Sequence, residues 1–102
     1  MVFIHSCGFI IYTMTEDKTP KYLLIRSAKG KIWGYPKGKQ EPDESDVETA
    51  RREVKEETGI TVTRLDGFKE DVHYFMRKDR SKRLTLFLGK ANTTEVTIKT
   101  DE

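Results

Sequence analysis

Three glutamates crowd one face of a predicted helix. Glu53 and Glu57 are four residues apart and share a face at the helical period, while Glu56 lies on the flank of that face. Neighbouring carboxylates repel each other, and the repulsion costs helix stability unless a cation offsets it. Arg52 can pair with Glu56, but one guanidinium cannot neutralise three carboxylates. The face is therefore either a solvated acidic surface or one half of a metal site.

A metal held by this face would be a hard cation. The available donors are carboxylate oxygens, and neither histidine nor cysteine lies within the same helix. Such a donor set favours Mg²⁺, or Mn²⁺ in its place, over zinc.

The spacing around the glutamates extends well beyond the triplet. Five residues separate Gly38 from Glu44, and seven more separate Glu44 from the pair Arg52-Glu53. The pattern then continues through Val54, Lys55, Glu56, Glu57, Thr58, Gly59 and Ile60. This stretch resembles the Nudix box, the signature of the Nudix hydrolase family, with every specified position filled.

The resemblance implies a role for each acidic position. Glu53, Glu56 and Glu57 would be catalytic metal ligands, and the carbonyl of Gly38 would complete their site. Relatives often add a carboxylate from a later loop, for which Glu102 is expected on position. Glu95 and Asp101 are the alternatives to Glu102.

Two further box residues would support the catalytic carboxylates. Arg52 would hold a glutamate in register through a charge-assisted hydrogen bond. Glu44, near the helix start, would support the preceding loop or help to orient water. Either Glu57 or Glu53 would accept the proton of the attacking water.

Family resemblance also implies the reaction class. Nudix hydrolases cleave a nucleoside diphosphate linked to another group, and divalent ions neutralise phosphate charge and lower the pKa of a bound water. The segments Trp33–Gly38, Asp66–Phe68 and His73–Phe75 look like those of the asymmetric diadenosine tetraphosphate hydrolases. For that substrate the products would be ATP and AMP.

The same resemblance nominates substrate contacts. In those enzymes an aromatic residue after the helix stacks on adenine, which points to Tyr74 with His73. The candidate polyphosphate contacts are basic residues, namely Lys37, Lys39, Lys82 and Arg83. For the basic turn before Lys82, a solubilising hairpin tip is the preferred interpretation, and a polyphosphate clamp is the alternative.

Other functions stay open at this point. Within the family they are a pyrophosphohydrolase acting on the 5′ end of RNA and hydrolases of nucleotide sugars, oxidised nucleotides or diphosphoinositol polyphosphates. A non-catalytic nucleotide-binding module is the alternative of a different class, although such modules usually lose box glutamates.

The elements that must position these residues can be predicted from local patterns. Residues 2–14 are rich in β-branched and aromatic types and predict a strand. Residues 21–28 predict its hairpin partner, with the apolar run Tyr22–Ile25 buried on both faces. Ser45–Thr58 predicts an amphipathic helix that starts with a capping box and stops at Gly59.

Later strands are expected over residues 60–65, 68–76 and 83–89, with a break at Asp66-Gly67. The predicted fold is therefore α/β (α+β): a Nudix-type mixed β-sheet sandwich packed on the helix of the box. Its last strand and second helix are expected to be missing relative to the family.

Composition sets the remaining bounds. A chain of 102 residues is one domain, expected to span 1–102 and to be C-terminally truncated. Nineteen basic and seventeen acidic residues give a net charge of +2, which argues against a nucleic-acid-binding arm. No apolar run could span a membrane, and the N-terminus lacks the basic region of a signal peptide. The single cysteine, Cys7, is expected to be a buried small hydrophobe in a cytoplasmic protein.

Overall fold

The computed structural model describes residues 2–26, 33–77 and 79–91. The elements in chain order are β1 (Val2–Met14), β2 (Pro20–Tyr22), β3 (Ile25–Arg26), β4 (Trp33–Gly34), β5 (Lys37–Lys39), α1 (Asp46–Thr58), β6 (Val62–Arg77) and β7 (Arg80–Ala91). Strands β3 and β4 form a separate antiparallel pair, and all other strands belong to one sheet.

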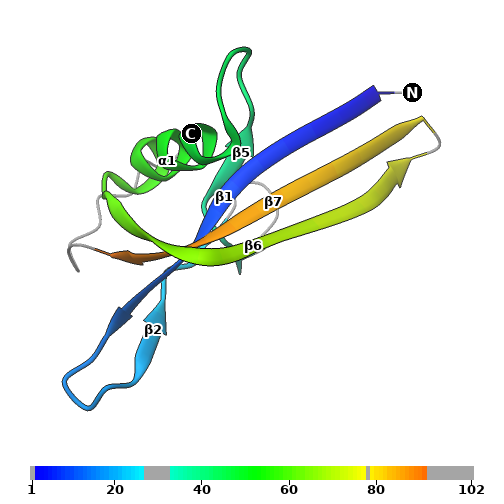
Figure 1. The fold of residues 1–102 in the computed structure, drawn as a ribbon. Coiled ribbons are helices and arrows are strands. Elements are labelled where there is room, and N and C mark those ends of the chain that lie inside the picture. Colours follow the sequence, from blue (N-terminus) through cyan, green and yellow to red (C-terminus); the bar gives the residue numbers. More distant parts are fainter. Residues whose placement is uncertain (1, 27–32, 78, 92–102) are drawn as a thin grey trace.

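The main sheet is mixed, as predicted. Its strand order is β2-β1-β7-β6, and β5 pairs with β1 beside β2. Strands β1 and β7 run parallel, whereas β2, β5 and β6 are antiparallel to their partners. Figure 1 shows α1 lying against one side of this sheet, next to β5 and β1. The predicted packing of a mixed sheet on one helix is confirmed.

Helix α1 begins and ends where local chemistry dictates. Ser45 is the N-cap, and its side chain and that of Glu48 each bond the other's backbone N–H in a capping box. Gly59 adopts the left-handed conformation at φ 76°, and its N–H bonds the carbonyl of Lys55. These two ends fix which residues of the box face the sheet.

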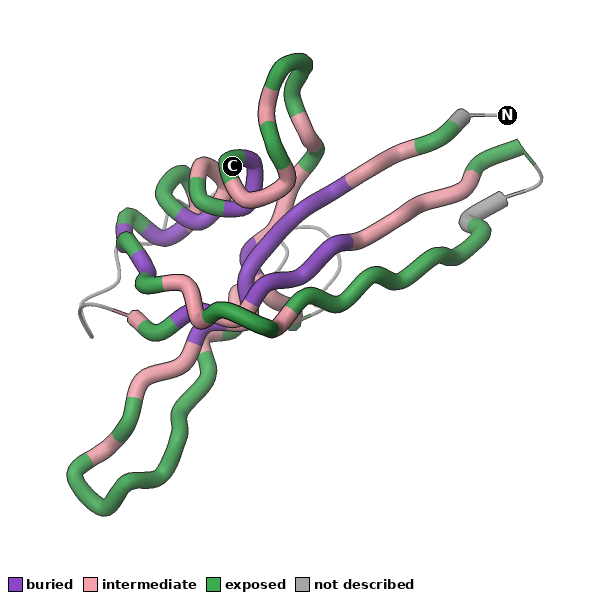
Figure 2. The backbone as a smooth tube through the Cα atoms, viewed as in Figure 1, coloured by how far each residue is buried: buried purple, intermediate pink, exposed green. Residues whose placement is uncertain are grey.

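The core lies between α1 and the centre of the sheet. Ala50 and Val54 of α1 pack with the alternate β1 residues Cys7, Phe9 and Ile11. Figure 2 shows the buried residues concentrated on the middle of β1 and β7 and on one side of α1, while most of β6 and the β1–β2 hairpin tip is exposed. The helix is therefore anchored to the strand that pairs with β5.

Two local predictions need correction. The run Tyr22–Ile25 is not a strand buried on both faces, because Tyr22 and Leu24 are exposed and β2 ends at Tyr22. Apolar sequence alone cannot bury an edge strand that other elements leave uncovered. Residues 62–77 form one strand rather than two, and the expected break at Asp66-Gly67 is a register shift between Arg64 and Lys69.

Among the described residues, no helix has the length and apolarity required to cross a bilayer.

Candidate active site

An arginine–glutamate ion pair fixes the start of the acidic site. The guanidinium of Arg52 meets Glu44 at two points, with Nε 2.8 Å from Oε2 and Nη2 3.1 Å from Oε1. Glu44 also accepts hydrogen bonds from the N–H of Glu41 and the hydroxyl of Thr49, both at 3.0 Å. These partners, with Arg52 foremost, lower the pKa of Glu44 to about 2. Glu44 is therefore an anion held in place by Arg52, Thr49 and the loop backbone.

Arg52 reaches three further groups from its place on α1. Its Nη2 donates to the carbonyl of Lys39 at 2.9 Å, which ties the end of β5 to the helix. Its Nη1 lies 3.2 Å from Glu56 Oε1 and 3.4 Å from Glu53 Oε1. The sequence predicted the pairing with Glu56 but not the stronger one with Glu44, which depends on how the loop returns to the helix.

Glu53 lies directly against Gly38. A Cβ atom added at Gly38 would overlap the Glu53 carboxylate, so position 38 has room for hydrogen only. Burial raises the pKa of Glu53, ahead of the opposing effect of Arg52. The loop and the helix thus meet at the point where the box requires a glycine.

Glu57 completes the contact between α1 and β5. Its Oε1 accepts the backbone N–H of Lys37 at 3.0 Å. Burial, followed by the negative charge of Glu53, raises the pKa of Glu57 to about 7. Glu56, the third glutamate, is half exposed and bonded to Arg52. One turn of helix therefore presents three carboxylates beside the Gly38 backbone, two of them with raised pKa values.

This donor set fits a divalent cation. Burial, reinforced by the neighbouring carboxylates, raises the pKa values of Glu53 and Glu57, so the described groups around them only partly stabilise their anionic forms. The positive charge of a hard divalent ion would stabilise these anionic carboxylates. The residues that could hold the ion are Glu53, Glu56 and Glu57 with the Gly38 carbonyl.

The side chains of the expected substrate contacts lie on opposite faces of the sheet. Gly38 is in register with Cys7 on the face covered by α1, so Lys37 and Lys39 project from the other face. Lys82 is in register with Ile4 and with Tyr74, which places the side chains of Lys82 and Tyr74 on the face opposite α1 as well. Three strand spacings, about 14 Å, separate β5 from β6.

His73 and Arg83 lie on the α1 face instead. They are in register with each other and with His5, whose ring lies 3.9 Å from Asp46 of α1. Arg83 is further occupied by Asp71, at 3.3 Å between Nη2 and Oδ1. The structure therefore brings Lys37, Lys39, Lys82 and Tyr74 to one face and separates His73 and Arg83 from them.

Comparison with known proteins assigns the family. The model of the NUDIX domain matches residues 5–102. The chain belongs to the Nudix hydrolase family. The matched range includes Glu44, Arg52 and the three box glutamates.

Similar proteins within the family come from several kingdoms. The asymmetrical bis(5′-nucleosyl)-tetraphosphatase of Rattus norvegicus is 33% identical over 94% of this chain and 71% of its own length. The mRNA-decapping enzyme subunit 2 of Arabidopsis thaliana is 39% identical over 85% of this chain but 22% of its own length. An Ap4A hydrolase of C. elegans in a binary complex superposes with a TM-score of 0.85 at 28% identity, over 94% of this chain and 72% of that one.

Glu102, like its alternatives Glu95 and Asp101, lies outside the described residues. Gln40, which the sequence did not single out, donates to the carbonyl of Glu44 and to Asp46 Oδ1, both at 2.9 Å. The only sequence signal for this role was the position of Gln40 between β5 and α1. A single glutamine in a loop can make many different contacts, so the sequence did not identify it.

Proposed function

We propose that this Nudix hydrolase catalyses the Mg²⁺-dependent hydrolysis of diadenosine tetraphosphate to ATP and AMP. The observation that carries the proposal is the contact of Glu53 with Gly38 beside Glu57, which places the acidic turn of α1 against the β5 backbone. The choice of substrate rests on similarity to the asymmetrical tetraphosphatase of Rattus norvegicus over 94% of this chain.

The residues of the chain divide the work between them. When bound, Mg²⁺ (or Mn²⁺) neutralises phosphate charge and acidifies water. Glu53, Glu56, Glu57 and the Gly38 carbonyl would hold the ion, and Arg52 with Glu44 keeps the helix and the loop in register. Glu57 or Glu53 accepts the proton of the attacking water.

The phosphates of the substrate reach the acidic turn of α1 at the β5 edge of the sheet, where Glu57 meets the backbone of Lys37, and the base extends over the face opposite α1. Lys37, Lys39 and Lys82 supply positive charge for the polyphosphate, and Tyr74 offers a ring, 40% exposed, for stacking on a base. His73 and Arg83, placed on the other face, have no part in this arrangement. An exposed ring stacks on any base, so adenine preference comes from similarity alone.

A substrate panel tests the proposal. The full chain and Mg²⁺ are incubated separately with four substrates: diadenosine tetraphosphate, capped RNA, 5′-triphosphorylated RNA and ADP-ribose. The products are resolved by chromatography. We expect the first to be turned over fastest, with ATP and AMP in equal amounts. Faster turnover of another substrate would contradict the choice of substrate, and equal activity in Glu57→Gln would contradict the role of the site.

RNA decapping is the second candidate function. The 39% identity to the decapping subunit of Arabidopsis thaliana favours it, although the match covers only 22% of that protein. Release of a methylated guanosine diphosphate from capped RNA, faster than any release of ATP from the dinucleotide, would establish it.

We place the protein in the cytoplasm on the basis of its single, buried cysteine.

A further inference from the structure

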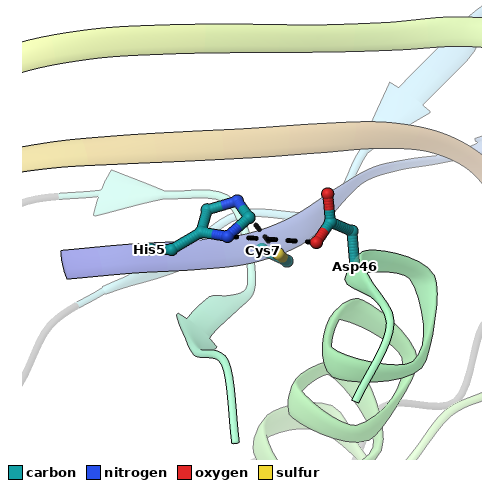
Figure 3. Close-up of side chains that lie close together, drawn as sticks. All are labelled: His5, Cys7 and Asp46. Atoms are coloured by element: carbon teal, nitrogen blue, oxygen red, sulfur yellow. Dashed lines mark hydrogen bonds and ion pairs between the residues drawn. The ribbon is translucent and has the colours of Figure 1, made fainter. Parts of the chain in front are cut away.

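A second group of metal-binding side chains lies under the start of α1, apart from the Nudix glutamates. His5 and Cys7 extend from β1 toward Asp46, the first residue of α1, as Figure 3 shows. One ligand atom from each residue lies within 4.8 Å of the other two. His5 Nδ1 is 3.9 Å from Asp46 Oδ1, and His5 Nε2 is 3.7 Å from Cys7 Sγ.

The hydrogen bonds of His5 decide which ring nitrogen carries a proton. The hydroxyl of Thr85 donates to Asp71 Oδ1 at 2.6 Å, so its single proton is already used. Its oxygen, 2.9 Å from His5 Nε2, must then accept from that nitrogen. In a neutral ring this leaves a lone pair on Nδ1.

That lone pair faces oxygen atoms that are themselves acceptors. Gln40 Oε1 lies 3.1 Å from His5 Nδ1, and Asp46 Oδ1 lies at 3.9 Å. The Gln40 amide cannot be reversed, because its nitrogen already donates to the carbonyl of Glu44 and to Asp46 Oδ1. With a neutral ring, a nitrogen lone pair, an amide oxygen and a carboxylate therefore converge. Either a proton on Nδ1, which would donate to Gln40 Oε1 and pair with Asp46, or a bound cation relieves this arrangement.

The buried sulfur indicates which cation. Cys7 is fully buried beside the His5 ring, and thiolate and imidazole ligands favour zinc-type ions over Mg²⁺. Bonds of about 2.0–2.3 Å in a tetrahedral zinc site place its ligand atoms roughly 3.3–3.8 Å apart. The separation of 3.9 Å between His5 Nδ1 and Asp46 Oδ1 is close to that range, and Gln40 Oε1 lies 3.1 Å from the same nitrogen.

We propose that His5, Cys7 and Asp46 bind a thiophilic divalent cation of the zinc class, with Gln40 Oε1 as the fourth donor. Thr85 and Asp71 orient the ring from behind, as outer partners of metal-bound histidines do. The cation joins β1 to the chain segment between β5 and α1.

The buried thiol adds selectivity. Burial raises the pKa of Cys7 to about 12, so a bound cation has to displace the thiol proton. Zinc-class ions deprotonate a coordinating thiol, whereas hard Mg²⁺ does not. The site therefore discriminates against the ion expected at the Nudix glutamates, with which it shares no ligand.

Cobalt binding tests the proposal on the full chain. The protein is titrated with Co²⁺ in excess Mg²⁺, which occupies the oxygen donors of the Nudix site. Because the chain has one cysteine, thiolate-to-cobalt charge-transfer absorption in the near ultraviolet can come only from Cys7. We expect this band to saturate at one equivalent and to disappear when Zn²⁺ is added.

The two histidines of the chain provide a matched pair of variants. His5→Gln is expected to weaken Co²⁺ binding at least about tenfold, and Asp46→Asn likewise. His73→Gln, which alters the other histidine, is expected to leave binding unchanged. Circular dichroism verifies that each variant is folded. A folded parent without the band, or His5→Gln and Asp46→Asn variants with parental affinity, would overturn the proposal.

Discussion

The guanidinium of Arg52 and the carboxylate of Glu44 form a two-point ion pair, with Nε 2.8 Å from Oε2 and Nη2 3.1 Å from Oε1. The same guanidinium bonds the carbonyl of Lys39 at 2.9 Å. One side chain therefore fixes the loop before α1, the end of β5 and the glutamates of the Nudix box relative to each other.

Arg52→Lys is expected to lower kcat/KM by roughly ten- to a hundredfold, because an ammonium group cannot reproduce the planar fork that meets Glu44 at two points. Steady-state kinetics with Mg²⁺ measure the effect. Arg51→Lys on the neighbouring helix position is the control, since Arg51 bonds the carbonyl of Val62 and no box glutamate. Equal losses in both variants would show that the pairing with Glu44 has no special role.

Gly38→Ala is expected to reduce kcat/KM by roughly a hundredfold, because the added methyl group would displace the Glu53 carboxylate. Gly34→Ala is the matched control in the same loop, since a Cβ there meets no atom within 4 Å. Both variants are assayed after their folding has been verified by circular dichroism. Parental activity in Gly38→Ala would mean that Glu53 does not need its place against the loop.

Stability of the metal-free protein is expected to depend on Glu57. Its pKa is near 7 in the folded state and 4.5 as an ordinary glutamate, so the folded state binds more protons between these values. The Glu57 contribution to stability is therefore complete below about pH 4.5 and is lost as the pH rises to about 7. Denaturant unfolding in EDTA measures it. Glu57→Gln is expected to remove this part of the pH dependence, and Glu16→Gln is expected to leave it unchanged.

Mg²⁺ binding is expected to strengthen as the pH rises through about 7, because Glu57 must lose its proton to bind the ion. Calorimetry in buffers of different ionisation enthalpy measures the protons released. The release should be absent in Glu57→Gln. If the Mg²⁺ affinity changes by less than about threefold between pH 6 and pH 8, Glu57 is not a ligand.

Tyr74→Ala is expected to raise KM for diadenosine tetraphosphate about tenfold, because a stacked base is worth roughly 1–3 kcal/mol. Tyr74→Phe, which keeps the ring, is expected to restore KM. His73→Ala is the control, because His73 lies on the face of the sheet covered by α1. If His73→Ala raises KM and Tyr74→Ala does not, the substrate occupies the opposite face from the one proposed.

Local sequence was sufficient for the helix. The capping box of Ser45 and Glu48 and the left-handed Gly59 are short-range devices, and both lie where the sequence predicted them. The amphipathic stripe of Ala50 and Val54 likewise faces the core. Helical spacing alone therefore determined that Glu53, Glu56 and Glu57 would cluster, and the Nudix spacing determined the family.

Contacts between elements that are distant in the sequence depended on the tertiary structure. The apolar run at Tyr22 lost its predicted burial because the strand ends at an uncovered edge, which no local pattern can reveal. Glu44 and Arg52 meet only because the loop after β5 returns to α1.

The face of the sheet on which a strand residue lies was likewise decided by the tertiary structure. From the sequence, His73 and Tyr74 were one aromatic pair, but successive residues of a strand point in opposite directions. Register with β1 then decided that His73 shares a face with α1 while Tyr74 shares one with Lys82. Residue types and spacing determined the chemistry of the helix, whereas the contact of Glu53 with Gly38 and the meeting of His5, Cys7 and Asp46 arise only when β1, β5 and α1 pack together.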